Sequence, residues 1–109
     1  MEKIVTIDGK ECRLVTNGAT PRIYRSLFQK EVFTAMTKAI NDKGEIVDAE
    51  VFENIAYCMA VQGGSIPMNT KIEDWLASMS SPTSVLEVAG EIMELWAVET
   101  KATSIGKKE

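Results

Sequence analysis

The stretch KIVTIDGKECRLVT, residues 3–16, decides how the fold begins. Apolar and β-branched residues alternate with polar ones on both sides of Asp8-Gly9, a dipeptide that favours the tight turn of a β-hairpin. The pattern predicts two antiparallel strands with one apolar face. Because a lone hairpin is marginal in water, the rest of the chain or a second copy must cover that face, and one strand edge can remain open to a partner strand.

A helical pattern follows the hairpin after Asn17-Gly18. Thr20 is expected to cap the helix, with Pro21 at the first helical position. Apolar residues recur every four positions over about five turns, at Tyr24, Phe28, Val32, Met36 and Ile40. This stripe predicts a core-facing helix that ends at residues 41–44, and it leaves open whether the helix is continuous or breaks near Gln29-Lys30.

Two further helical segments are predicted between residues 48 and 79. Asp48 can cap the first, and the Gln-Gly-Gly sequence of residues 62–64 stops it. Its apolar residues on one face are Val51, Phe52, Ile55, Ala56 and Met59. After a connector that contains Pro67, Thr70 and Glu73 have the spacing of a capping box, which would begin a short helix. That helix carries Trp75, Leu76 and Met79.

The last predicted helix runs from Ser84 to Glu99, behind the cap-then-proline pair Ser81-Pro82. Its apolar stripe consists of Val85, Val88, Ala89, Ile92, Leu95 and Trp96. Gly90 within it costs about 1 kcal/mol relative to alanine, a loss often associated with close backbone approach to another element. Residues 100–109 have no apolar period and are expected to form a disordered tail. The expected fold is therefore α+β and mostly helical, with a hairpin at 3–16 and four to five helices in a single domain of residues 1–99.

Composition supports one globular domain. The 109 residues are 45% hydrophobic and 26% charged, enough apolar content for a core without disulfides. The first residues resemble no signal peptide and no run is long enough to span a membrane, so a cytoplasmic protein is expected. Cys12 and Cys58 lie far apart without a Cys-x-x-Cys spacing, and both are expected to be reduced.

The net charge of −4 hides a polarity along the chain. Residues 1–44 carry a net charge of +3, residues 45–99 carry −9 and residues 100–109 carry +2. The basic excess is too small and too diluted for nonspecific nucleic-acid binding. A solvated acidic surface is the ordinary explanation, and contact between basic and acidic patches of successive subunits is the sharper one. The second predicts an oligomer that shifts to smaller species at high salt.

The residue types favour a protein that is not an enzyme. The chain has no histidine, no Cys/His cluster for zinc and no phosphate-binding glycine loop, so no cofactor or metal is expected. Glu87 and Glu91 are neighbours on the face opposite the apolar stripe, where solvated carboxylates are expected. No base lies beside Ser65, Ser80 or Ser81 in the sequence.

Methionine and tryptophan are concentrated in the second half of the chain. Methionine adapts to irregular apolar partners, so these side chains could hold an unfolded or flexible partner, although gap filling in the core is the more common use. The candidate surface for a partner or for oligomerisation consists of Trp75, Met79, Met93 and Trp96. Replacing Trp96 with alanine is expected to weaken folding or partner binding.

In order and spacing, four segments together resemble the tail assembly chaperones of long-tailed bacteriophages and prophages. They are residues 6–10, residues 22–28, residues 72–76, and residues 91–96 followed by a tail with threonine and lysine. The resemblance spans nearly the whole chain. It implies a non-enzymatic protein in the host cytoplasm, absent from the mature virion, that coats the tape measure protein and keeps it soluble while tail tube protein assembles around it.

The resemblance also implies a homo-oligomer and a longer, frameshifted form of the same protein as a partner. Gly106, Lys107 and Lys108 are the candidate position for the frameshift, because glycine and lysine codons can form a slippery run of G and A. Two other classes stay open. One is a small acidic inhibitor of a host nucleic-acid enzyme, and the other is a virion component such as a connector or tail terminator.

Overall fold

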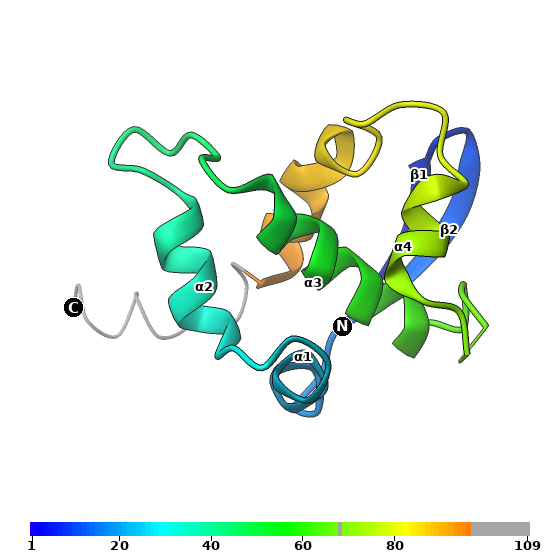
Figure 1. Ribbon diagram of the computed structural model, residues 1–109, viewed down its shortest axis with the longest axis horizontal. Helices are drawn as coiled ribbons and strands as arrows, with labels where there is room; N and C mark the ends of the chain where they lie inside the picture. Colours follow the sequence, from blue (N-terminus) through cyan, green and yellow to red (C-terminus); the bar gives the residue numbers. More distant parts are fainter. Residues whose placement is uncertain (68, 97–109) are drawn as a thin grey trace.

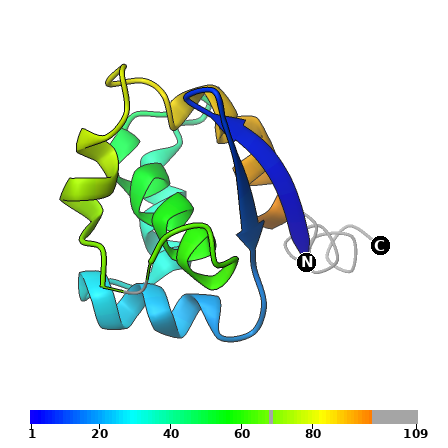
Figure 2. The same ribbon diagram turned by 90° about the vertical axis from the view of Figure 1, so that its right-hand side faces the viewer.

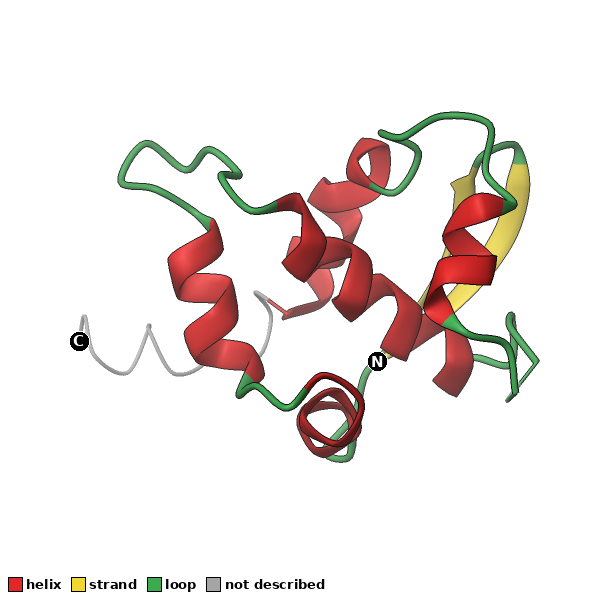
Figure 3. Cartoon of the chain, viewed as in Figure 1, coloured by secondary structure: helices red, strands yellow, loops and turns green. Residues whose placement is uncertain are grey.

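The computed structural model describes residues 1–67 and 69–96. In chain order these form β1 (Glu2–Ile7), β2 (Lys10–Val15), α1 (Thr20–Phe28), α2 (Val32–Ala39), α3 (Ala49–Gln62), α4 (Ile72–Ala77), the 3-10 turn η1 (Leu86–Val88) and a helical segment at 89–96. The predicted order of a hairpin followed by helices is confirmed (Figures 1 and 3). The tail at 100–109, with the candidate frameshift position Gly106 to Lys108, lies outside the described residues.

The hairpin forms as predicted. β1 and β2 pair antiparallel, and Ile7 faces Lys10 across a two-residue turn. Asp8 and Gly9 have φ angles of 55° and 79°, the left-handed values that such a turn requires. Alternate side chains of the two strands are buried, namely Val5, Ile7, Cys12 and Leu14. The hairpin therefore contributes one apolar face to the core.

The helix predicted over residues 20–40 is broken. α1 ends at Phe28, and the φ of 60° at the next residue, Gln29, turns the chain out of the helix. α2 then begins at Val32, behind the cap residue Glu31, whose carboxylate accepts the backbone N–H groups of Phe33 (2.8 Å) and Thr34 (2.9 Å). The glutamate thus caps a new helix, which answers the question that the apolar stripe left open. Thr20 is not the cap of α1, because the cap position is Ala19 and Thr20 is already helical.

α3 forms the centre of the molecule, with the hairpin, α1, α2 and α4 around it (Figure 2). Asp48 caps it as predicted, accepting the backbone N–H of Glu50 at 3.2 Å. Its core-facing residues are Val51, Phe52, Ile55, Ala56, Cys58 and Met59. The helix ends at Gly63, where the chain passes close to the backbone of Arg13 on β2. In the described part of the chain, no helix has the length and apolar character needed to cross a bilayer.

The capping box predicted at Thr70 and Glu73 is wrong. The cap position of α4 is Lys71, and no side chain bonds there. The carbonyl of Thr70 instead accepts a hydrogen bond from the hydroxyl of Tyr57, which holds the connector against α3. Because Lys71 is the cap, the third helical residue is Asp74, so Glu73 stands one position short of where a capping box requires a glutamate.

The last helical region begins less regularly than predicted. Residues 82–85 form turns, η1 follows, and regular helix occupies 89–96 of the described residues, while residues 97–99 of the predicted helix lie outside them. Ser81 does act near the start, because its hydroxyl accepts the backbone N–H of Thr83 at 3.2 Å. Gly90 is exposed, and a Cβ there would meet no described atom within 4 Å, so its expected close backbone approach is not found.

Candidate partner-binding surfaces

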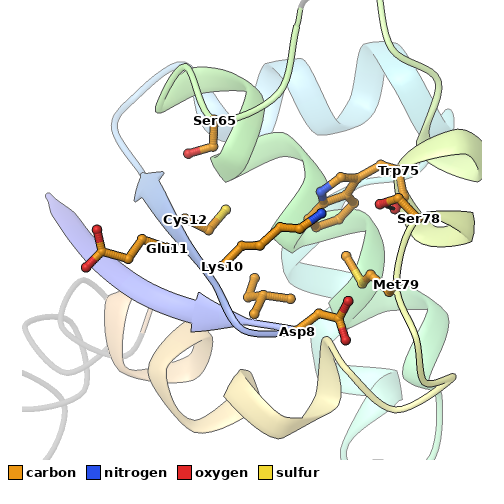
Figure 4. Close-up of a pocket in the computed structure, with 9 residues that line it drawn as sticks. Asp8, Lys10, Glu11, Cys12, Ser65, Trp75, Ser78 and Met79 are labelled. Atoms are coloured by element: carbon orange, nitrogen blue, oxygen red, sulfur yellow. Dashed lines mark hydrogen bonds between the residues drawn. The ribbon is translucent and has the colours of Figure 1, made fainter.

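The candidate residues Trp75 and Met79 lie beside the turn of the hairpin. Both are half-buried, and both line a small cavity of about 100 Å³ between α4 and β2. Figure 4 shows the side chain of Lys10 extending from β2 toward this cavity, whereas Glu11 points away from it. Its other lining residues are Ile7, Asp8, Cys12, Ser65 and Ser78. The cavity is too small for a drug-sized ligand, so the positions of Trp75 and Met79 are explained by packing between α4 and the hairpin rather than by ligand binding.

Asp8 joins the hairpin turn to the loop after α4. Its carboxylate accepts the backbone N–H of Ser80 at 3.2 Å and the hydroxyl of Ser80 at 2.5 Å. These bonds lower the pKa of Asp8 below its ordinary value, and the bond from the Ser80 hydroxyl contributes most. The sequence did not reveal this carboxylate beside Ser80. A carboxylate with a lowered pKa is a weak base, so the contact favours a structural role.

The other two serines considered in the sequence also have structural contacts. Ser65 donates its hydroxyl to the backbone carbonyl of Arg13, and Ser81 accepts the backbone N–H of Thr83. Of the two glutamates expected to be solvated, Glu87 is exposed and Glu91 is half-buried. The exposed Glu94 forms an ion pair with Lys3 at 3.0 Å. In residues 1–67 and 69–96 no group of three or more metal-ligating side chains is placed to hold an ion.

Cys12 and Cys58 are both buried, and no disulfide joins them. Burial raises the pKa of the Cys12 thiol, and it raises that of Cys58 to about 12. Thiolate is the nucleophilic form, so burial and the raised pKa values both disfavour reaction of these thiols at neutral pH. The prediction of unpaired cysteines is confirmed.

Trp96 does not belong to an exposed surface. Its side chain is only 1% exposed, and its ring packs edge-on against Phe33 of α2 with centroids 5.5 Å apart. The expectation that Trp96 joins Trp75 in one partner surface is therefore wrong, since α2 and α4 lie at opposite ends of the molecule (Figure 1). Met93 is half-buried and packs against the core. The apolar stripe predicted for the last helix includes Trp96, so the periodicity of the sequence already indicated that this side chain is buried.

An apolar groove between α1 and α4 was not recognised in the sequence. It has a volume of about 410 Å³ and is open to solvent. Its apolar residues are Leu27, Phe28, Tyr57 and Ile72, and Asn69, Thr70, Lys71 and Glu73 form a polar border. Leu27 remains 49% exposed. The signal that could have found it is Leu27, which stands beside the predicted stripe just before the helix break.

Two lining residues of this groove, Phe28 and Tyr57, belong to a row of aromatic rings from three helices. Tyr24 and Phe28 of α1 have ring centroids 5.0 Å apart. Phe28 meets Tyr57 of α3 at 6.4 Å, and Tyr57 meets Trp75 of α4 at 5.9 Å. Such tilted and edge-on contacts fix the rings relative to one another. The groove is therefore preformed rather than dependent on a partner.

Comparisons with protein-family models, with curated proteins and with solved structures find no match to this chain.

Proposed function

We propose that this chain is a non-enzymatic tail assembly chaperone of a long-tailed bacteriophage or prophage. It binds the tape measure protein, keeps that protein soluble and helps to recruit tail tube protein during tail assembly. The observation that supports the proposal most directly is the groove between α1 and α4. It is open to solvent, its wall residue Leu27 is 49% exposed, and its border is polar.

The groove suits the apolar face of a helical partner. Amphipathic helices bind in apolar grooves through anchors spaced three or four residues apart, with polar residues left at the border. Leu27 and Ile72 supply aliphatic contact area on the two walls, and the two aromatic lining residues supply rigid surface at little entropic cost. One such groove binds weakly. Many copies that bind along one extended tape measure protein, the client, bind with high avidity, because each further contact then forms within the same complex.

The proposal is tested by co-expressing the chain with the tape measure protein of the same phage. Leu27→Lys places a charge in the groove and, because Leu27 is half-exposed, leaves the core intact. Val47→Lys is the matched control, since Val47 is an exposed apolar residue (61%) outside the groove. The unmodified chain and Val47→Lys are expected to keep the client in the soluble fraction, and Leu27→Lys is expected to lose it.

Salt separates this function from the acidic inhibitor. Binding driven by apolar burial persists at 1 M salt, whereas binding of a phosphate-mimicking surface falls steeply. A client that stays insoluble with the unmodified chain, or equal solubility with Leu27→Lys and Val47→Lys, would contradict the proposal. Intact-mass analysis of the native gene with its downstream DNA adds a further test, because the proposal expects a minor longer product that departs near Gly106 to Lys108.

A further inference from the structure

The two edges of the hairpin are not equivalent. Met1 and Thr16 exchange two backbone hydrogen bonds, of 2.8 and 2.9 Å, at the open end of the hairpin. Hydrogen-bonded pairs alternate along an antiparallel ladder, so this pair fixes the phase of all the others. The backbone N–H and C=O groups that point away from β2 therefore belong to Glu2, Ile4 and Thr6.

The outer edge of β2 is blocked at its middle residue, Arg13, by the end of α3. The N–H of Arg13 donates to the hydroxyl oxygen of Ser65 at 2.7 Å, and that hydroxyl donates to the carbonyl of Arg13 at 2.9 Å. Gly63 also lies against the same carbonyl. No further strand can pair at Arg13, because both of its outward groups are bonded and the neighbouring space is filled.

The outer edge of β1 is open in the described residues. The outward backbone groups of Glu2, Ile4 and Thr6 have no hydrogen-bond partner within residues 1–67 and 69–96. The strand has no proline and no bulge, which are devices that protect natural edges from pairing. Ile4, at the middle of this edge, is 62% exposed and is the most exposed large apolar side chain of the described residues.

We propose that the β1 edge pairs with the β1 edge of a second copy, joining two hairpins into a four-stranded antiparallel sheet. One register places all three outward residues opposite one another, with Ile4 against Ile4 and Glu2 against Thr6. Each of these pairs exchanges two hydrogen bonds. The register also places no like charges opposite each other, because Lys3 then faces Val5.

This pairing gives a closed dimer. The contact is two-fold symmetric, so each copy uses the same edge. The β2 edges become the outer edges of the four-stranded sheet, and the block at Arg13 in the middle of each prevents a further strand from pairing along it. The proposal concerns how two copies of the chain meet, and it does not rest on the chaperone function.

The test uses the full chain and measures its mass by sedimentation equilibrium over a range of concentrations. The unmodified chain is expected to move from one copy of 12.0 kDa to two as its concentration rises. Ile4→Lys places two ammonium groups opposite each other and is expected to raise the dissociation constant at least about tenfold. Val47→Lys is the matched control, since it adds the same charge at an apolar position of nearly equal exposure.

Amide hydrogen exchange on the unmodified chain tests the register without any variant. The amides of Glu2, Ile4 and Thr6 are expected to become protected as the concentration rises. Those of Lys3, Val5 and Ile7 are bonded to β2 and are protected at every concentration. This alternation is specific to the β1 edge, because association through another surface would leave the outward amides exchanging rapidly.

Three results would overturn the proposal. The first is a single copy at all concentrations, and the second is an equal dissociation constant for Ile4→Lys and Val47→Lys. The third is a dimer that dissociates at high salt while the amides of Glu2, Ile4 and Thr6 stay unprotected. That last result would assign association to the basic and acidic segments of the chain, since salt screens ion pairs but not backbone hydrogen bonds.

Discussion

A Cβ atom on Gly63 would lie 2.0 Å from the backbone carbonyl oxygen of Arg13. The contact brings the end of α3 against β2, and the hydroxyl of Ser65 bonds the same residue two positions later. The φ of Gly63 is −77°, an ordinary helical value, so the glycine is required for space rather than for backbone freedom. The hairpin and the central helix are joined at this point.

Gly63→Ala is expected to destabilise the protein by about 2 to 4 kcal/mol, because the backbone of β2 or of α3 must move to accept one methyl group. Gly90→Ala is the matched control, since a Cβ there meets no described atom within 4 Å. It is expected to stabilise the protein by up to about 1 kcal/mol through helix propensity. Urea titration of both variants measures the two values, and losses of similar size would refute the role given to Gly63.

Glu31 is expected to make stability depend on pH in the acid range. Hydrogen bonds from the backbone of Phe33 and then Thr34 lower its pKa below the ordinary value of 4.5. A carboxylate whose pKa is lowered on folding stabilises the protein above its unfolded pKa, and that stabilisation is lost as the pH falls through the lower folded value.

Glu31→Ala should therefore cost about 1 kcal/mol at pH 7, as other cap deletions do, and less at pH 3. Glu87→Ala is the control, because Glu87 is an exposed glutamate with no hydrogen bond to its side chain in the described residues. Chemical denaturation at the two pH values gives the comparison. A cost for Glu31→Ala that does not change with pH would show that the carboxylate charge plays no part in the cap.

Cys58 is expected to make the protein sensitive to alkali. Burial raises its pKa from 9.0 to about 12, so folding favours the neutral thiol. The resulting stabilisation is complete below about pH 9 and is lost as the pH rises toward 12. The free energy of unfolding should fall across this window. The free energy of unfolding of Cys58→Ala should start at a lower value, because a cavity replaces the thiol, and should fall less steeply with pH.

Thiol labelling at pH 8 provides an independent measurement of the same burial. Neither Cys12 nor Cys58 should react with a thiol reagent in the folded protein, and both should react in urea. Rapid labelling of Cys58 under native conditions would mean that the thiol is accessible, and the alkaline dependence would then lose its basis.

The elements that local chemistry determines were predictable from the sequence. Asp8-Gly9 determines the hairpin turn, and the apolar periods of α3 and of 85–96 match their buried faces. The break at Gln29 was harder, because the apolar stripe continues through it. The apolar stripe is the same for a continuous helix and for two helices. Glu31 is compatible with both as a residue type, and only the structure shows that its side chain caps α2.

The contacts between distant residues could not be predicted. Asp8 and Ser80 are 72 positions apart, and Tyr57 reaches Thr70 only because α3 and the connector are packed together. The same holds for the groove, whose walls come from α1 and α4. Trp75 and Trp96 were assigned to one candidate surface because methionine and tryptophan are concentrated in the second half of the chain. It contains no information on which end of the molecule each one occupies.

The two tryptophans should therefore separate folding from binding. Trp96 is 1% exposed, so Trp96→Ala is expected to destabilise the protein by about 3 to 5 kcal/mol, through loss of buried area and of the contact with Phe33. Trp75 is half-buried beside Tyr57, so Trp75→Ala should cost less in stability and instead disturb the aromatic lining of the groove. Thermal unfolding and client solubility are measured on both variants. A Trp96→Ala protein with an unchanged melting midpoint would contradict its place in the core. A Trp75→Ala protein that still solubilises the tape measure protein fully would show that binding does not need the contact of Trp75 with Tyr57.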